Sequence, residues 1–108
     1  MPIIDISGLR PEEADAMDEI EEGIKAYFTE LIGLSSPDHV MVTFFTNERT
    51  KPNEHVMARL ISKYFWNKDQ KHIDEVCWAV VEILETAGHP YNEAFPLHAL
   101  AMSGRELK

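Results

Sequence analysis

The order strand, helix, strand occurs twice along this chain of 108 residues, and this repetition restricts its possible folds more than any other feature. Residues 2–7 and 39–46 have strand character and flank a first helical stretch. Residues 56–66 and 94–102 flank a second one in the same way, 54 positions further on (from residue 2 to residue 56). Because parallel strands of one sheet are joined by right-handed crossovers, each half is predicted to form a βαβ unit.

Two apolar stripes predict the helices. In the first stripe, apolar residues recur at three- and four-residue steps, which places them on one helix face; they are Met17, Ile20, Ile24, Tyr27, Phe28 and Leu31. The second stripe has similar spacing and consists of Ile73, Val76, Cys77, Val80, Ile83 and Leu84. Pro11 predicts the start of the first helix, because proline is favoured at the first helical position. Gly33 predicts its end, and residues 67–70 offer N-caps for the second helix.

The two longer strand segments have different patterns. Residues 39–46 are β-branched and aromatic and nearly continuous in apolar character, which is typical of an interior strand. In residues 56–66, alternation places Arg59 and Lys63 on one face, together with Met57, Ile61 and Phe65. The opposite face would carry Ala58, Leu60, Ser62, Tyr64 and Trp66. Two cations fit a helix-covered core poorly, so the face with Arg59 and Lys63 is predicted to be the open face of the sheet.

These elements predict a single α+β domain over residues 1–108, with a pseudo-repeat of residues 2–46 and 56–102. A four-stranded mixed sheet with both helices on one face would bury both apolar stripes. The alternative is a ferredoxin-like βαββαβ domain, which has the same order of elements and usually dimerises.

Composition excludes several classes of function. The chain carries 19 acidic against 10 basic residues, a net charge of −9, which disfavours binding to nucleic acid or to an anionic membrane. Its single cysteine, Cys77, permits no intrachain disulfide. The first residues lack the features of a secretory signal, and no apolar run approaches the ~18 residues of a spanning helix. We therefore expect a cytoplasmic protein, and the scattered histidines predict no metal site and no cofactor.

Pro2 follows Met1 directly and opens the first strand. Cytosolic processing readily removes a methionine that precedes so small a residue, and the chain would then begin with a secondary amine. Such an amine acts as a base if its pKa falls below the usual α-amino range of roughly 7.7–8.0. Burial or a nearby cation would lower that pKa, because both disfavour the ammonium form.

The Met-Pro start, the two βαβ halves and the run from Tyr64 to Lys71 together resemble the tautomerase superfamily, which includes 4-oxalocrotonate tautomerase and macrophage migration inhibitory factor. The closest likeness is to a bacterial branch of that superfamily. The resemblance implies that the Pro2 amine acts as general acid or base on a small keto or enol carboxylate. It also implies a pocket shared between the subunits of a trimer, with cations that hold the carboxylate.

The cations that the resemblance implies are only partly present. Arg10 follows the first strand, close to the place of one substrate-binding arginine, whereas Met41 and Leu34 stand where further cations are expected. The candidate substrate-binding residues are Arg10, Arg59, Lys63 and Lys68, with Arg49 as a further cation and His98 as a possible second acid. We expect a tautomerase-like isomerase. The alternative is a non-catalytic oligomeric module of the same fold, or a ferredoxin-like binding module.

Overall fold

The computed structural model describes residues 2–51 and 54–97. The strands are β1 (Ile3–Ser7), β2 (Met41–Phe45), β3 (Val56–Ile61) and β4 (Asn92–Pro96). The helices are α1 (Ala14–Ile32) and α2 (Gln70–Thr86), and two short 3-10 turns are η1 (Pro37–His39) and η2 (Lys63–Asn67). The chain therefore runs β1-α1-β2 and then β3-α2-β4, as the repeated pattern predicts.

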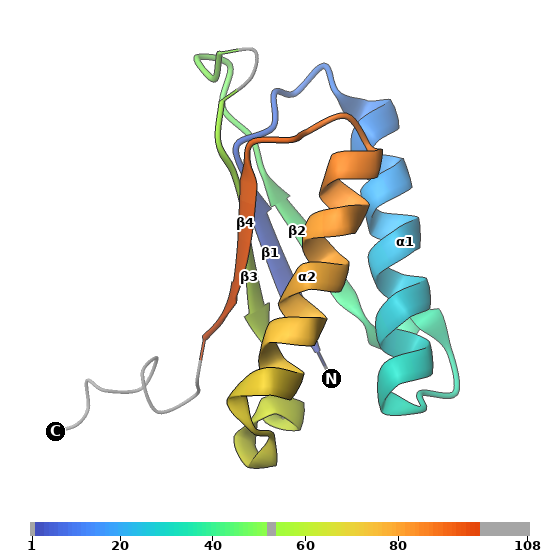
Figure 1. Cartoon of the computed structure of the whole chain (residues 1–108). Coiled ribbons are helices and arrows are strands. Elements are labelled where there is room, and N and C mark those ends of the chain that lie inside the picture. Colours follow the sequence, from blue (N-terminus) through green and yellow to red (C-terminus); the bar gives the residue numbers. More distant parts are fainter. Residues whose placement is uncertain (1, 52–53, 98–108) are drawn as a thin grey trace, which may run out of the picture.

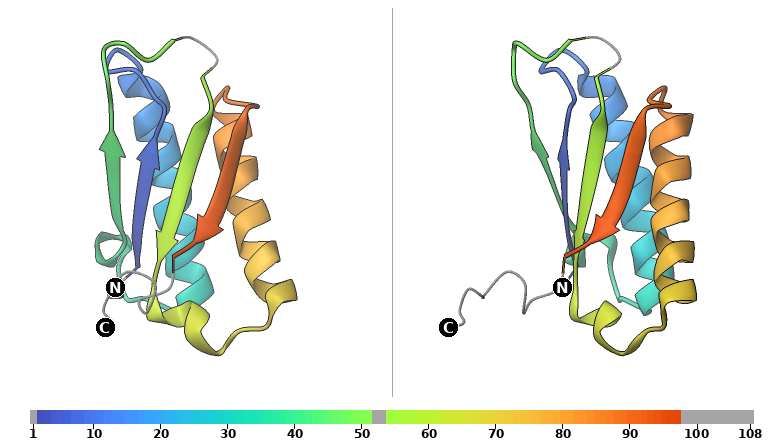
Figure 2. Two further views of the ribbon diagram at one scale, coloured as in Figure 1. Left: turned by 90° about the vertical axis from the view of Figure 1, so that its left-hand side faces the viewer. Right: turned by 60° about the vertical axis from the view of Figure 1, so that its left-hand side comes forward.

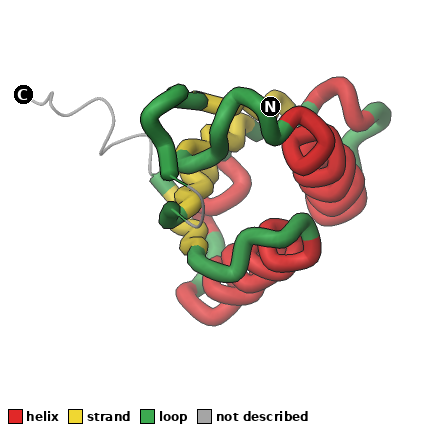
Figure 3. Tube along the Cα trace, turned by 90° about the horizontal axis from the view of Figure 1, so that it is seen from above, coloured by secondary structure: helices red, strands yellow, loops and turns green. Residues whose placement is uncertain are grey.

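The four strands form one mixed sheet in the order β2-β1-β3-β4. β1 pairs in parallel with β2, β3 in parallel with β4, and the two central strands β1 and β3 are antiparallel. Both helices cover the same face of the sheet, and the other face is open (Figures 1 and 2). The view from above shows the helices on one side of the strands (Figure 3). The predicted α+β fold with a four-stranded mixed sheet and two helices is confirmed.

The ferredoxin-like alternative does not describe this sheet. That fold splits each βαβ unit by placing another strand between its two parallel strands. Here the two strands of each unit are direct neighbours, since β1 pairs with β2 and β3 with β4.

The core lies between the sheet and the two helices. Its helical members are the predicted stripes, and the fully buried ones are Ile20, Ile24, Phe28, Ile73, Val76, Val80 and Leu84. The sheet contributes the alternate residues Ile4, Ile6, Val56, Ala58 and Leu60. Each such aliphatic or aromatic side chain stabilises the fold by about 1.5–3 kcal/mol on burial, so the two stripes fix both helices against the sheet.

α1 begins at Ala14, three residues after the predicted start at Pro11. The backbone N–H of Glu13 donates to the carbonyl of Arg10 (3.0 Å), and the Glu13 carboxylate accepts from the Arg10 N–H (2.7 Å). These two bonds close a turn over residues 10–13 before the helix can start. The other predicted helix ends are confirmed: Gly33 has φ +79° after α1, and the Asp69 side chain caps α2 by accepting from the His72 N–H.

β2 is an edge strand, so the prediction of an interior strand for residues 39–46 is wrong. Its alternate residues Val42 and Phe44 pack against the core, whereas Met41 and Phe45 are about half exposed. Packing within one chain therefore does not explain why Met41 and Phe45 are apolar.

β3 ends at Ile61, so the predicted strand over residues 56–66 is too long. The Ser62 hydroxyl accepts from the Tyr64 N–H (3.1 Å) and thereby starts η2. Lys63 consequently does not share the strand face with Arg59. Phe65, predicted on the open face, is buried in the core, and Trp66, predicted to face the helices, is 53 % exposed. β4 covers residues 92–96, and the rest of the predicted strand from residue 98 on lies outside the described residues.

Gly8 is predicted to tolerate no side chain. Its φ is +104°, and a Cβ would lie 2.3 Å from the carbonyl oxygen of His55. Gly88 has a similar φ of +96° but open space around it, so it is a matched control. We expect Gly88→Ala to cost about 1 kcal/mol of unfolding free energy and Gly8→Ala about 3 kcal/mol, because only the latter adds a steric overlap to the backbone strain. Urea denaturation measures both; equal losses would contradict the close approach of residues 8 and 55.

Candidate functional site

Pro2 lies buried at the start of the central strand β1. Its carbonyl oxygen accepts from the Met41 N–H (3.0 Å), at the start of β2. The next residue, Ile3, pairs with Met41 on one side and with Ile61, the last residue of β3, on the other. The residue-2 nitrogen therefore belongs to the end of the sheet at which β2 begins and β3 ends.

Lys63 and Lys68 lie at this same end, because η2 follows directly after Ile61. The Lys63 ammonium is 5.6 Å from the centroid of the Trp66 ring, and that of Lys68 is 4.6 Å from the Tyr64 ring. Both lysines are exposed. Of the predicted substrate-binding cations, Lys63 and Lys68 are the two that follow the end of β3 beside Pro2.

Arg10 and Arg49 lie at the opposite end. β1 runs from Ile3 to Ser7, and at roughly 3.3 Å per residue the step from residue 2 to residue 7 spans about 16 Å. Arg10 follows this far end and forms ion pairs with Glu12 (3.6 Å) and Glu13 (3.7 Å). Arg49 lies in the loop after β2, which ends at the same side as β1. Within one subunit neither is placed beside Pro2, so Arg10 could serve a Pro2 pocket only from another copy.

Arg59 lies on the open face, as predicted. It is the register partner of Asp5, but its guanidinium donates to the Ser7 hydroxyl (3.4 Å). Neither Asp5 nor Arg59 forms an ion pair with any residue that the structure describes. By strand alternation the rest of this face carries Ser7, Thr43 and the exposed Glu93 together with six apolar residues, Ile3, Met41, Phe45, Met57, Ile61 and Phe95.

Glu13 connects two loops at the end of the sheet away from Pro2. Besides its bonds to Arg10, its carboxylate lies 3.1 Å from His89 Nε2, in the connection between α2 and β4. The side chains of Glu13 and His89 are largely buried, 19 % and 14 % exposed. This contact gives Arg10 and His89 a structural role that the sequence pattern did not predict.

Tyr64 and His72 form a pair that the sequence also did not predict. The Tyr64 hydroxyl lies 2.6 Å from His72 Nε2, and Nδ1 of the same ring lies 3.9 Å from the Glu75 carboxylate. The helical spacing indicates the second contact, since residues 72 and 75 are three apart. The first contact depends on η2, which residues 63–67 form in place of the predicted strand.

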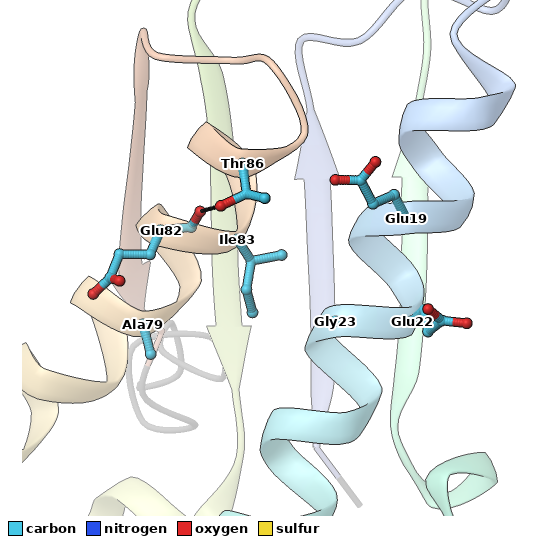
Figure 4. A pocket seen from close by; sticks show the side chains of 7 residues that line it. All are labelled: Glu19, Glu22, Gly23, Ala79, Glu82, Ile83 and Thr86. Carbon is cyan, nitrogen blue, oxygen red and sulfur yellow. Dashed lines mark hydrogen bonds between the residues drawn. The ribbon is translucent and has the colours of Figure 1, made fainter.

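Three of the surface pockets are lined by described residues, and Pro2 is not among those residues. The largest is a groove of about 460 Å³ between α1 and α2 (Figure 4). The helices approach closely there, because Gly23 leaves room for Ile83. The two others, of about 270 Å³ each, lie between α2 and β4 and beside Tyr27. A single chain therefore gives Pro2 no pocket among these three.

Cys77 is not suited to nucleophilic catalysis. Burial, aided by the charge of Asp74, raises the pKa of its thiol, which stays protonated at neutral pH. Burial likewise raises the pKa of the Tyr27 phenol. His98 lies outside the described residues. Within residues 2–51 and 54–97, no three His, Cys, Asp or Glu side chains are grouped to hold a metal ion.

The fold and this arrangement define an α+β domain with two adjacent βαβ units and an open sheet face. Comparison of the sequence with models of known families and with curated proteins gives no match. In the described residues, no helix is both long and apolar enough to cross a membrane.

Proposed function

We propose that this chain is a tautomerase-like isomerase whose N-terminal amine, exposed by removal of Met1, transfers protons on a small keto or enol carboxylate. The observation that carries the proposal is the position of Pro2. It is buried at the start of the central strand of a sheet built from two adjacent βαβ units. Burial disfavours the ammonium form, which favours a neutral amine that can accept a proton.

Proton abstraction next to a carbonyl produces an enolate, and cations near the pocket stabilise it. Lys63 and Lys68 follow the end of β3 that pairs beside Pro2, so they can hold the substrate carboxylate within the same subunit. Arg10 would take part from a neighbouring subunit, whereas Arg59, on the open face, is assigned to the contact between subunits. The proposed ligand is thus a small carboxylate, and we propose that the protein acts in the cytoplasm, without a cofactor.

We further propose that the open face of the sheet is covered by other copies of this chain, with a trimer as the expected assembly. An apolar face of this kind is unusual on a monomer. At its centre, Asp5 and Arg59 carry opposite charges and form no ion pair among the described residues. Asp5 of one copy can therefore pair with Arg59 of another. Assembly would also enclose the end of the sheet at which Pro2 lies, where β2 begins and β3 ends.

A second candidate function is that of a non-catalytic oligomeric module. Two observations favour it: Met41 and Leu34 occupy places where the tautomerase resemblance implies cations, and Arg10 is engaged by Glu12 and Glu13. In this case the amine would stay blocked by Met1 and the open face would serve assembly alone.

Ketonisation of phenylenolpyruvate, measured on protein whose intact mass is known, separates the two functions. The isomerase should lack Met1 and convert the enol faster than buffer alone does. A protein that assembles and shows no activity on this or related enol carboxylates, whether it retains Met1 or has been freed of it, would be the module.

A further inference from the structure

The Tyr64 hydroxyl, the His72 imidazole and the Glu75 carboxylate stand in a row. Tyr64 OH lies 2.6 Å from His72 Nε2 in a partly buried position, and His72 Nδ1 lies 3.9 Å from Glu75 Oε1. When Nε2 accepts the phenol proton, the proton of the ring itself is on Nδ1, the side of Glu75. A hydroxyl hydrogen-bonded to a base is the central part of an activated nucleophile, recognised by geometry and not by sequence position. Glu75 lies on the side of the Nδ1 proton but beyond hydrogen-bond distance of it.

Local backbone contacts hold the two main members in place. The Ser62 hydroxyl accepts from the N–H of Tyr64 at the start of η2. The Asp69 carboxylate accepts from the N–H of His72 in the first turn of α2 (2.9 Å). η2 and the first turn of α2 are neighbours in space, at the lower end of the molecule (Figure 1). The pair is thus positioned by two capped turns.

One cation lies beside the Tyr64 ring, and η2 carries a second one beside an exposed indole. Lys68 lies 4.6 Å from the centroid of the Tyr64 ring, and Lys63 lies near Trp66, which is 53 % exposed. Neither lysine forms an ion pair within the described part of the chain. Two such cations with an indole suit an anionic ligand that has a planar group.

We propose that Tyr64 is a nucleophile activated by His72, at a second site that takes a small anionic ester. The phenol oxygen bonds to the ester carbonyl carbon, and the bond from that carbon to the leaving oxygen breaks with its electron pair. The phenol proton passes to His72 Nε2 and from there to the leaving oxygen, so an alcohol departs and the acyl group remains on Tyr64. Lys68 holds the anionic group of the ester. The site does not use Pro2, although it shares Lys68 with the carboxylate-binding cations of the isomerase proposed above.

The test is the rate at which an aryl sulfonyl fluoride that carries a carboxylate modifies each tyrosine, followed by peptide mass mapping. The phenol oxygen bonds to sulfur, fluoride departs, and the base takes the proton. The three tyrosines of this chain provide internal controls. We expect Tyr64 to react at least about tenfold faster than Tyr91, although Tyr91 is 63 % exposed. Tyr27, whose phenol pKa is raised by burial, should react slowest.

Variants identify the cause of the rate. His72→Phe should reduce modification of Tyr64 to that of an ordinary phenol and leave Tyr91 unchanged. A rate that stays low at the partly buried Tyr27 reports that the fold persists. Lys68→Met should slow the anionic reagent and not a neutral one. Modification in the order of exposure, with Tyr91 first, would overturn the proposal on the wild-type chain alone. An unchanged Tyr64 rate in His72→Phe or in His72→Gln would show that the pair is only a structural tie between η2 and α2.

Discussion

Replacing Pro2 by alanine is expected to lower kcat/KM for ketonisation of an enol carboxylate by about 100-fold, because general acid–base catalysis contributes about 10²–10⁴-fold. Met1 is removed before alanine as well, so the variant keeps an amine but not the pyrrolidine ring that fixes its direction. Pro2 donates no backbone hydrogen bond, and its carbonyl bond to Met41 survives the change. The fold should therefore be retained.

Pro11→Ala is the matched control for this variant. Pro11 is exposed in the turn before α1, at the far end of the sheet, so the same chemical change there should leave the rate unchanged. Activity of Pro2→Ala within about threefold of wild type would contradict a catalytic role for the amine. An equal loss in Pro11→Ala would assign the effect to the fold.

Reversing the charge of Arg59 is expected to dissociate the assembly. If Arg59 meets Asp5 of another copy, Arg59→Glu places like charges together in a desolvated interface, which costs about 2–5 kcal/mol, or about 30- to 5,000-fold in the dissociation constant. Asp5→Lys should have the same effect. The double variant restores opposite charges and should restore assembly, as measured by light scattering over a concentration series.

Lys71→Glu is the control for Arg59→Glu, since it makes the same charge change at an exposed residue of α2. Enol ketonisation should fall with assembly in the single variants and return in the double variant, because the proposed Pro2 pocket is completed by a neighbouring copy. A wild-type chain that is monomeric at all concentrations, or single variants that still assemble, would contradict the role of the open face.

The helical stripes and the repeated order of elements made the fold predictable. Ile20, Ile24 and Phe28, like Val76 and Val80, must share a covered face, and this requirement places both helices on the sheet. The start of α1 was not predictable from Pro11 alone, because the side chain of Glu13 closes a turn with Arg10 before the helix. Such local contacts compete with propensity and leave little trace in the pattern.

The pattern of β2 was misleading for a physical reason. A continuous apolar run usually means a strand covered on both faces. Val42 and Phe44 are covered by the core, whereas Met41 and Phe45 lie on the open face of an edge strand. The sequence cannot show whether a face of β2 is covered by the same chain or by another copy. The apolar residues on the open face favour another copy.

The candidate site was less predictable than the fold. The alternating pattern correctly assigned Arg59 to the open face. It also predicted a strand beyond Ser62, although the side chain of Ser62 ends the strand. Lys63 therefore lies in η2 and not in β3, and the Tyr64 hydroxyl lies within hydrogen-bond distance of His72. Contacts between a turn and a helix depend on where the strand stops, so spacing alone could not predict them.

The central claim, that a free Pro2 amine is the catalytic group, is tested most directly on one sample of purified protein that retains Met1. The rate of phenylenolpyruvate ketonisation is measured before and after methionine aminopeptidase treatment, with the loss of one methionine followed by intact mass. A free Pro2 amine predicts a rise of about 100-fold that parallels the mass change. Complete removal of Met1 with no change in rate would contradict the claim.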